Sequence, residues 1–234
     1  MSEFDPSDPL LEQEFQKLVQ REDLVEYMRD QVNDFNELMA YYTCAMMEVE
    51  TKFKVLSEGF SYQYERNPIE SIKSRLKSVR SIRNKLERRG FDFSVSNIEQ
   101  ELHDVAGVRV ICSFIDDVYM LACALEQQDD ITVLERKDYI EHPKENGYRS
   151  LHLIVSVPIF LTNEKRVMHV EVQLRTIAMD FWATIEHHLR YKKNFHFTQE
   201  MADELQECAD VSAQLDKRMN KLRTDILEQP NLCM

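Results

Sequence analysis

Apolar residues near both ends of the chain recur with a helical period. From Met28 to Leu56 they follow alternating spacings of four and three residues, and the same rhythm returns from Met201 to Ile226 with one polar member. A period of about 3.5 residues is typical of long helices with one apolar seam. Thr198 stands where an N-cap belongs. We therefore expect an N-terminal helical segment over residues 10–58 and a C-terminal helix over 198–228.

The middle of the chain carries strand patterns. Runs rich in β-branched and apolar residues predict strands over 108–114, 131–134, 151–157 and 167–175, with a helix over 117–126. Two short helices are expected to begin at Asn67-Pro68-Ile69-Glu70 and at Ser96-Asn97-Ile98-Glu99, because both strings have the form of a capping box. The expected fold class is α/β: one domain over 1–234, with a mixed-sheet core over 67–192 flanked by the two long helices.

Polar residues alternate with apolar ones along three of the predicted strands. In the last strand Glu171 and Gln173 stand between valines and a leucine, and His152 and Arg109 have apolar neighbours in their own strands. Because side chains alternate between the two faces of a sheet, these four residues can share one polar face if the register allows. An ordinary solvated face is the alternative for any one strand.

Charge is distributed unevenly. The formal net charge is −13, yet residues 66–89 hold nine basic residues against two acidic ones. One basic island on an acidic protein suits a compact polyanion such as a nucleoside triphosphate better than long nucleic acid, and DNA is not an expected partner. A solvated helix face is the alternative. The four scattered glycines build no glycine-rich phosphate loop, so side chains would have to hold the phosphates.

Several classes of protein are excluded by composition. The longest apolar stretch, 151–161, is shorter than the roughly 20 residues of a membrane-spanning helix. The acidic first residues do not form a secretory signal, and five scattered cysteines without a CxxC pair suit reduced thiols. We therefore expect a cytoplasmic protein that does not bind membranes.

Two acidic residues are candidates for a divalent metal. Asp104 precedes the first predicted strand and Glu171 lies in the last, and carboxylates are the hard ligands that such ions prefer. The His103-Asp104 pair also occurs in HD-type metal phosphohydrolases, which need a further histidine upstream. All seven histidines lie at or after residue 103, so this alternative is weak.

Four ordered motifs resemble the RelA/SpoT-type synthetase domain. They are residues 68–86 (PIE, SRLKS and SI..KL), 103–109 (HDVAGVR), 144–152 (KENGYRSLH) and 171–187 (EVQLRTIAMDFWATIEH). The length leaves no room for the hydrolase and regulatory domains of the long members. The chain therefore resembles a small alarmone synthetase, closer to the RelP type than to the RelQ type.

The resemblance implies a synthetase core of nucleotidyltransferase-like fold. Such an enzyme transfers the β,γ-pyrophosphate of ATP to the 3′-hydroxyl of GDP or GTP, releases AMP, uses Mg²⁺ and makes the ppGpp or pppGpp of the stringent response. It also implies a homotetramer, with the terminal helices expected at subunit contacts. Packing of these helices on the core of their own chain, or on each other, is the alternative. A non-catalytic nucleotide- or RNA-binding module on the same fold is the alternative, and the presence of both Asp104 and Glu171 favours the enzyme.

Matching the motifs position by position implies a site for the donor nucleotide. Arg75 and Arg109 correspond to the pair that sandwiches adenine, which suits guanidinium planes. Lys77 and Lys85 correspond to residues that hold the ATP phosphates, and Ser81 lies in the phosphate-binding segment.

The same match implies an acceptor site and a catalytic centre. Tyr148 corresponds to the tyrosine that stacks on guanine. Lys144 and His152 are expected near the acceptor phosphates, and Gln173 near the base or ribose. Asp104 and Glu171 correspond to the magnesium carboxylates, with Glu171 also the general base. The segment 135–138 (ERKD) departs from the charged signatures of long synthetases and leaves the preference for GDP or GTP open.

Overall fold

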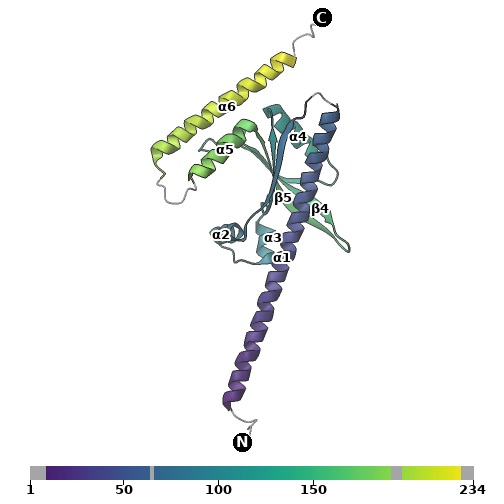
Figure 1. The fold of residues 1–234 in the computed structure, drawn as a ribbon, viewed down its shortest axis with the longest axis vertical. Helices are drawn as coiled ribbons and strands as arrows, with labels where there is room; N and C mark the ends of the chain where they lie inside the picture. Colours follow the sequence, from purple (N-terminus) through teal and green to yellow (C-terminus); the bar gives the residue numbers. More distant parts are fainter. Residues whose placement is uncertain (1–8, 64–65, 191–196, 228–234) are drawn as a thin grey trace. The chain divides into compact units, whose positions relative to one another are not determined.

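The computed structural model describes residues 9–63, 66–190 and 197–227 (Figure 1). The chain divides into two compact units, residues 1–41 and 42–234. The first unit consists, where described, of the N-terminal part of the helix α1 (Pro9–Gln63). Met28 and Val32 of the predicted seam lie there and are more than half exposed. All of the predicted chemistry lies in the second unit.

A five-stranded mixed sheet forms the centre of the second unit. The strands are arranged in the order β1-β2-β5-β4-β3, in which β2 and β5 are parallel and every other pair is antiparallel. Their bounds are β1 (Ile69–Leu76), β2 (Ala106–Cys112), β3 (Thr132–Asp138), β4 (Leu151–Phe160) and β5 (Lys165–Thr176). The four predicted strands thus correspond to β2 to β5, and the expected α/β class with a mixed sheet is confirmed.

The remaining helices connect and flank these strands. They are α2 (Val79–Arg89), α3 (Val95–Glu101), α4 (Ile115–Glu126), α5 (Ile177–Arg190) and α6 (Gln199–Leu227). The helices α5 and α6 pack side by side (Figure 1). The predicted cap of α6 is present, since the backbone N–H of Met201 donates to the Thr198 hydroxyl at 3.3 Å. Residue 228 and residues 191–192, where the C-terminal helix and the core were expected to end, lie outside the described residues.

The helix expected at Asn67-Pro68-Ile69-Glu70 is wrong. The Asn67 side chain accepts from the Ile69 N–H at 2.9 Å in a turn, and the chain then continues as the strand β1, which pairs with β2. Glu70 accepts from the Ser113 hydroxyl rather than from a helix terminus. A local capping pattern is overridden here by pairing with a strand about 40 residues further on. The helix of the basic island begins instead at Val79, with Ser78 as its N-cap.

The second capping box marks a real helix but misplaces its start. The N-cap of α3 is Ser94, whose hydroxyl accepts from the Asn97 N–H at 3.2 Å. Ser96 lies within the first turn. The helix therefore begins two residues earlier than Ser96-Asn97-Ile98-Glu99 predicts.

The sheet has one apolar face and one polar face. Val108, Val110, Leu153, Val172 and Leu174 are at most 1% exposed and share the apolar face by register. On α1, the seam residues Val49 and Phe53 are also fully buried in the chain itself. This part of the predicted seam therefore belongs to the core of the subunit and not to a subunit contact.

Candidate active site

The predicted polar face exists, because the register of three strands brings its members together. Gln173 of β5 lies opposite Arg109 of β2 on one side and His152 of β4 on the other, while Glu171 lies opposite Gly107. Arg109 donates to the Gln173 side-chain oxygen at 3.3 Å, and the Gln173 amide donates to Glu171 at 2.8 Å. A continuous hydrogen-bonded row thus crosses the centre of the sheet.

Glu171 is held at both of its carboxylate oxygens. Oε1 lies 3.2 Å from His152 Nδ1, and Oε2 accepts from Gln173. Burial alone would raise the pKa of Glu171, but the hydrogen bond and charge of His152, together with Gln173, outweigh it and hold the pKa below its ordinary value. The carboxylate is therefore ionised and fixed in orientation at neutral pH.

Asp104 lies just before β2 and accepts hydrogen bonds from two ammonium groups. Lys77 Nζ and Lys85 Nζ are 2.5 and 2.6 Å from the same oxygen, Oδ2. Burial opposes ionisation of Asp104, yet the two lysines together hold its pKa below the ordinary value. Burial also lowers the pKa of Lys77. Two members of the basic island thus form one cluster of charges with the carboxylate, whereas Arg80, Arg83, Arg88 and Arg89 of α2 are exposed, as a solvated helix face predicts.

A cavity of about 230 Å³ lies over this face of the sheet. It is lined by Arg75, Asp104, Arg109, Glu171 and Gln173, with Lys73 and Ser74 among the remaining lining residues. Arg75 pairs with Gly107 across β1 and β2, so it shares the face of Arg109. Larger hollows along α6 are lined by other, mainly apolar residues. Of the predicted donor residues, Arg75 and Arg109 line the polar cavity, and Lys77 and Lys85 contact Asp104 in its wall.

The two carboxylates fit a magnesium ion. Asp104 Oδ1 is buried and has no hydrogen-bond partner among the described residues, which leaves one oxygen available to a ligand. Glu171 lines the same cavity. Mg²⁺ is commonly bound through one or two carboxylates together with water and substrate phosphates. The described part of the chain contains no cluster of three His, Cys, Asp or Glu side chains that could hold a metal.

Aromatic and basic side chains gather at the end of the row where the acceptor is expected. The Tyr148 hydroxyl lies 2.8 Å from His152 Nε2, so the row continues from Glu171 through His152 to Tyr148. Lys144 Nζ stands 4.9 Å from the centre of the Tyr148 ring and 4.6 Å from that of Tyr139. Burial raises the pKa of the Tyr148 phenol, so it stays neutral and is suited to stacking and hydrogen bonding rather than to acting as a base.

Ser81 is set apart from these contacts. It lies in the first turn of α2, where its hydroxyl is 2.9 Å from that of Ser78 and its N–H donates to Ser78. The N-terminus of a helix attracts anions because its first N–H groups lack partners within the helix. The position suits a phosphate, and the hydrogen bonds described for Ser81 are with Ser78 rather than with the carboxylates.

Sequence reasoning assigned no role to Arg175 and Asp180. Arg175 is 4% exposed and donates to Tyr148 Oη and to the Gln173 side-chain oxygen. Asp180 of α5 accepts from Arg175, from Arg109 and from Lys73, each at 3.4 Å. Arg175 stood in the alternating row of β5, and that alternation was the available signal. Asp180 lies within the motif 171–187, but no spacing rule identifies its partners, which lie on three different strands.

Comparison with known proteins agrees with this geometry. The model of the region found in RelA and SpoT proteins matches residues 74–196. The chain belongs to the RelA/SpoT family. The relationship predicted from the four motifs is thereby confirmed.

Two relatives from Bacillus subtilis extend the match beyond that region. The GTP pyrophosphokinase YwaC is 44% identical over 82% of this chain and 90% of its own length, and the GTP pyrophosphokinase YjbM is 36% identical over 80% and 87%. Both relatives are of similar extent to this chain.

Solved structures from the same organism share the fold. Small alarmone synthetase 1 bound to its product pppGpp has a TM-score of 0.77 at 34% identity, and covers 83% of this chain and 98% of its own. Small alarmone synthetase 2 has a TM-score of 0.73 at 44% identity, with 81% and 97% covered. Among the described helices of this chain, none has the length and apolarity needed to span a bilayer.

Proposed function

We propose that the protein synthesises ppGpp or pppGpp, by transferring the β,γ-pyrophosphate of ATP to the 3′-hydroxyl of GDP or GTP and releasing AMP. Relatives named GTP pyrophosphokinases and a similar structure bound to pppGpp support this activity. The observation that carries it is that Asp104 and Glu171 line one cavity. Two lysines bind Asp104 there, and His152 contacts Glu171. A phosphate-binding cluster and an oriented base thus meet at one place.

The donor nucleotide is assigned to the β1, β2 and α2 side of the cavity. Arg75 and Arg109 offer guanidinium planes for the adenine, and such stacking is worth about 0.5–2 kcal/mol per contact. Lys77 and Lys85 supply positive charge for the phosphates, and Ser81 adds a hydroxyl at the N-terminus of α2. The cavity that Arg75 and Arg109 both line supports the adenine site, and the contacts of the two lysines with Asp104 in the same cavity support the phosphate site.

The acceptor nucleotide is assigned to the other end of the row. Tyr148 is assigned as the stacking partner of guanine, Lys144 and His152 as contacts of its phosphates, and Gln173 as the residue that orients the base or ribose. The distances between Tyr148, His152 and Glu171 support one continuous acceptor side.

In the reaction, Glu171 accepts the proton of the 3′-hydroxyl as that oxygen attacks the β-phosphorus of ATP. The bond between the β-phosphorus and the oxygen bridging to the α-phosphate breaks, and AMP leaves with that electron pair. His152 fixes the carboxylate that takes the proton. Lys77 and Lys85 stabilise the charge that moves through the phosphates. Asp104 and Glu171 would hold Mg²⁺, which supplies charge neutralisation at the phosphates when it is bound.

Incubation with ATP, Mg²⁺ and GDP or GTP tests the activity. AMP and a guanosine 3′-pyrophosphate should form in equal amounts, and neither should form without the acceptor. Comparison of the two acceptors decides the preference that residues 135–138 leave open. If both nucleotides bind and no AMP appears, the chain is a nucleotide-binding module and not a synthetase.

Assembly into a homotetramer is also part of the proposal. Leu215, Met219, Leu222 and Ile226 of α6 are each about half exposed or more, and Phe181 of α5 is 68% exposed. Contiguous exposed apolar surface of this kind is typical of protein–protein interfaces. The α6 seam supports the expected subunit contact, whereas the buried part of the α1 seam does not. We further propose a catalytic core over 67–192 and a cytoplasmic role in the stringent response.

A further inference from the structure

The helix α6 lies directly against the loop that carries Tyr148. Gly147 has φ +80°, and a Cβ added there would lie 2.4 Å from the Ala209 side chain and 2.9 Å from Gln206 Nε2. Both of these residues belong to α6. The loop before Tyr148 therefore passes so close to α6 that only a glycine fits.

The residue after Tyr148 is tied to α6 as well. Arg149 NH1 lies 3.4 Å from Asp216 Oδ2, with the two residues only 8% and 6% exposed. Asp216 also accepts from the hydroxyl of Thr176, at 2.7 Å, and Thr176 is fully buried. Burying a charge is costly unless it is paired. Arg149 therefore keeps its buried position only while Asp216 provides the opposite charge.

Tyr148 itself packs against side chains of α5 and α6. It lies against a buried cluster of Trp182, Ala183 and Ala209, and the Trp182 indole donates to the Leu205 carbonyl of α6 at 2.9 Å. The residues before and after Tyr148, and Tyr148 itself, thus all contact α6 or its packing partners. None of these contacts belongs to the row formed by His152, Glu171 and Gln173.

From this arrangement we infer that Asp216 is a positioning residue for the acceptor nucleotide. Through Arg149 it fixes the loop so that the Tyr148 ring is held ready for guanine. The inference rests on the proposed function, in which Tyr148 stacks on the acceptor base. Asp216 belongs to α6, whereas none of the residues proposed to contact the acceptor lies on that helix.

The variant Asp216→Asn keeps the size of the side chain and removes the charge that pairs with Arg149. We expect the KM for GDP to rise by about 10- to 100-fold, the range that follows from small misplacements of a binding group. The kcat at saturating GDP and the KM for ATP should stay near the wild-type values. A general loss of structure would lower kcat and affect both substrates alike.

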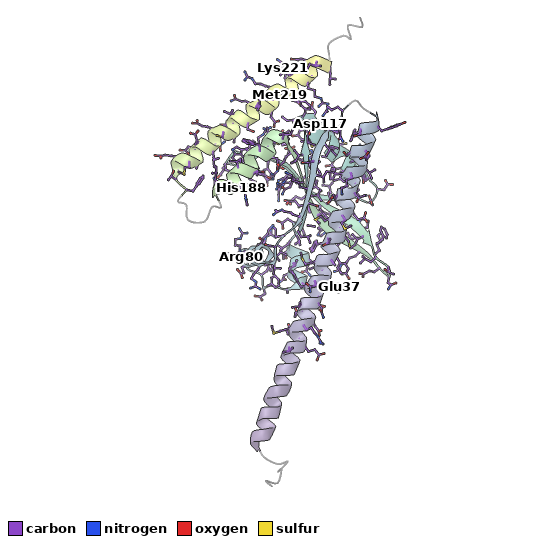
Figure 2. The ribbon with its side chains drawn as sticks, in the orientation of Figure 1. Glu37, Arg80, Asp117, His188, Met219 and Lys221 are labelled. Carbon is purple, nitrogen blue, oxygen red and sulfur yellow. The ribbon has the colours of Figure 1, made fainter. Side chains whose placement is uncertain are left out.

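Arg223→Met is the matched control, because it also removes one partner of an α6 ion pair. Arg223 lies 3.2 Å from Asp117 of α4, and Figure 2 shows Asp117 close to the half of α6 that carries Met219 and Lys221. The control should lose thermal stability while the KM for GDP stays unchanged.

The single tryptophan of the chain gives a second readout. Trp182 is 5% exposed in the cluster that supports Tyr148. Asp216→Asn should shift its emission to longer wavelength as water reaches the loosened cluster, and GDP should reverse part of that shift. Neither change is expected in Arg223→Met.

A double-mutant cycle tests whether Arg149 and Asp216 act on GDP binding through the same ion pair, so that the inference does not depend on one variant alone. Arg149→Gln should raise the KM for GDP as much as Asp216→Asn does, and the double variant should add little, because both substitutions break the same pair. Additive effects, or equal losses of ATP and GDP affinity, would overturn the inference. Direct titration of GDP decides it even if the wild type releases no AMP, a result that would contradict the proposed function alone.

Discussion

His152 holds one carboxylate oxygen of Glu171 across the β4–β5 pair, with 3.2 Å between Nδ1 and Oε1. The opposite ring nitrogen of His152 faces the Tyr148 hydroxyl. One imidazole therefore connects the residue proposed to take the proton with the residue proposed to bind the acceptor base. The proposed activity requires this connection, because the 3′-hydroxyl must reach Glu171 from a guanosine held at Tyr148.

Glu171→Gln should lower the rate of AMP release by at least about 10²- to 10⁴-fold, the usual contribution of a general base. The amide keeps the shape of the side chain but cannot accept the proton or contribute charge to a metal. The rate is measured with ATP, Mg²⁺ and GDP, after circular dichroism has established that the variant is folded. AMP release at the wild-type rate by a folded variant would show that Glu171 is not the general base.

Arg75→Ala and Arg109→Ala should weaken ATP binding, whereas Tyr148→Ala should weaken binding of the guanine nucleotide. Each change removes one stacking partner, worth about 0.5–2 kcal/mol. Titrations with a non-hydrolysable ATP analogue and with GDP measure the two affinities separately. Lys165→Ala is a control, because Lys165 lies at the far end of β5 over Phe160.

Equal impairment of both nucleotides by Tyr148→Ala would contradict this division of the site. Arg109 needs particular care, since it also contacts Gln173 and Asp180. If Arg109→Ala lowers the affinity for GDP and Arg75→Ala does not, the loss is due to disruption of the hydrogen-bonded row. Only a loss of ATP affinity that both arginine variants show measures stacking on adenine.

Asp104→Asn should raise the Mg²⁺ concentration needed for half-maximal activity by about 10- to 100-fold or more, since even residues behind a metal ligand change affinity by that range. The unpartnered oxygen Asp104 Oδ1 is the structural reason. Chelation of Mg²⁺ should abolish AMP release by the wild type. A variant with an unchanged Mg²⁺ requirement would remove Asp104 from the metal site.

The polar face was predictable because strand alternation is a local property. A period of two fixes the face of Glu171 and Gln173 from the sequence alone, and the partners Arg109 and His152 follow once three strands are assumed to be neighbours. The strand β1 was not predictable in this way. Its capping-box letters favoured a helix, and only pairing with β2 explains why the chain is extended there.

Contacts between distant segments account for what sequence reasoning missed. Arg149 and Asp216 are 67 residues apart, and Asp180 meets partners on three strands. No spacing rule within one helix or strand links such residues. For the apolar seam of α1 the pattern was detected but its partner was wrongly assigned. A period of 3.5 does not distinguish a partner helix from the chain's own core, in which Val49 and Phe53 are buried.

The seam of α6 carries the remaining prediction, which concerns assembly. Leaving the exposed side chains of Leu215 and Leu222 in water forfeits about 25 cal/mol per Å² of apolar surface. We therefore expect the wild type to have the mass of a homotetramer in light scattering at micromolar concentration. Leu215→Glu combined with Leu222→Glu should break the contact through α6 and reduce the mass.

A matched control keeps the same change in net charge on a different face of the helix. Gln214→Glu with Lys221→Gln also lowers the net charge by two, and both positions are exposed. The control should retain the wild-type mass, which would show that loss of apolar contact and not charge repulsion separates the subunits. A monomeric wild type would refute the assembly. An unchanged mass in the leucine variant would move the interface away from α6, and the exposed apolar residues of α5, such as Phe181, would be the next surface to alter.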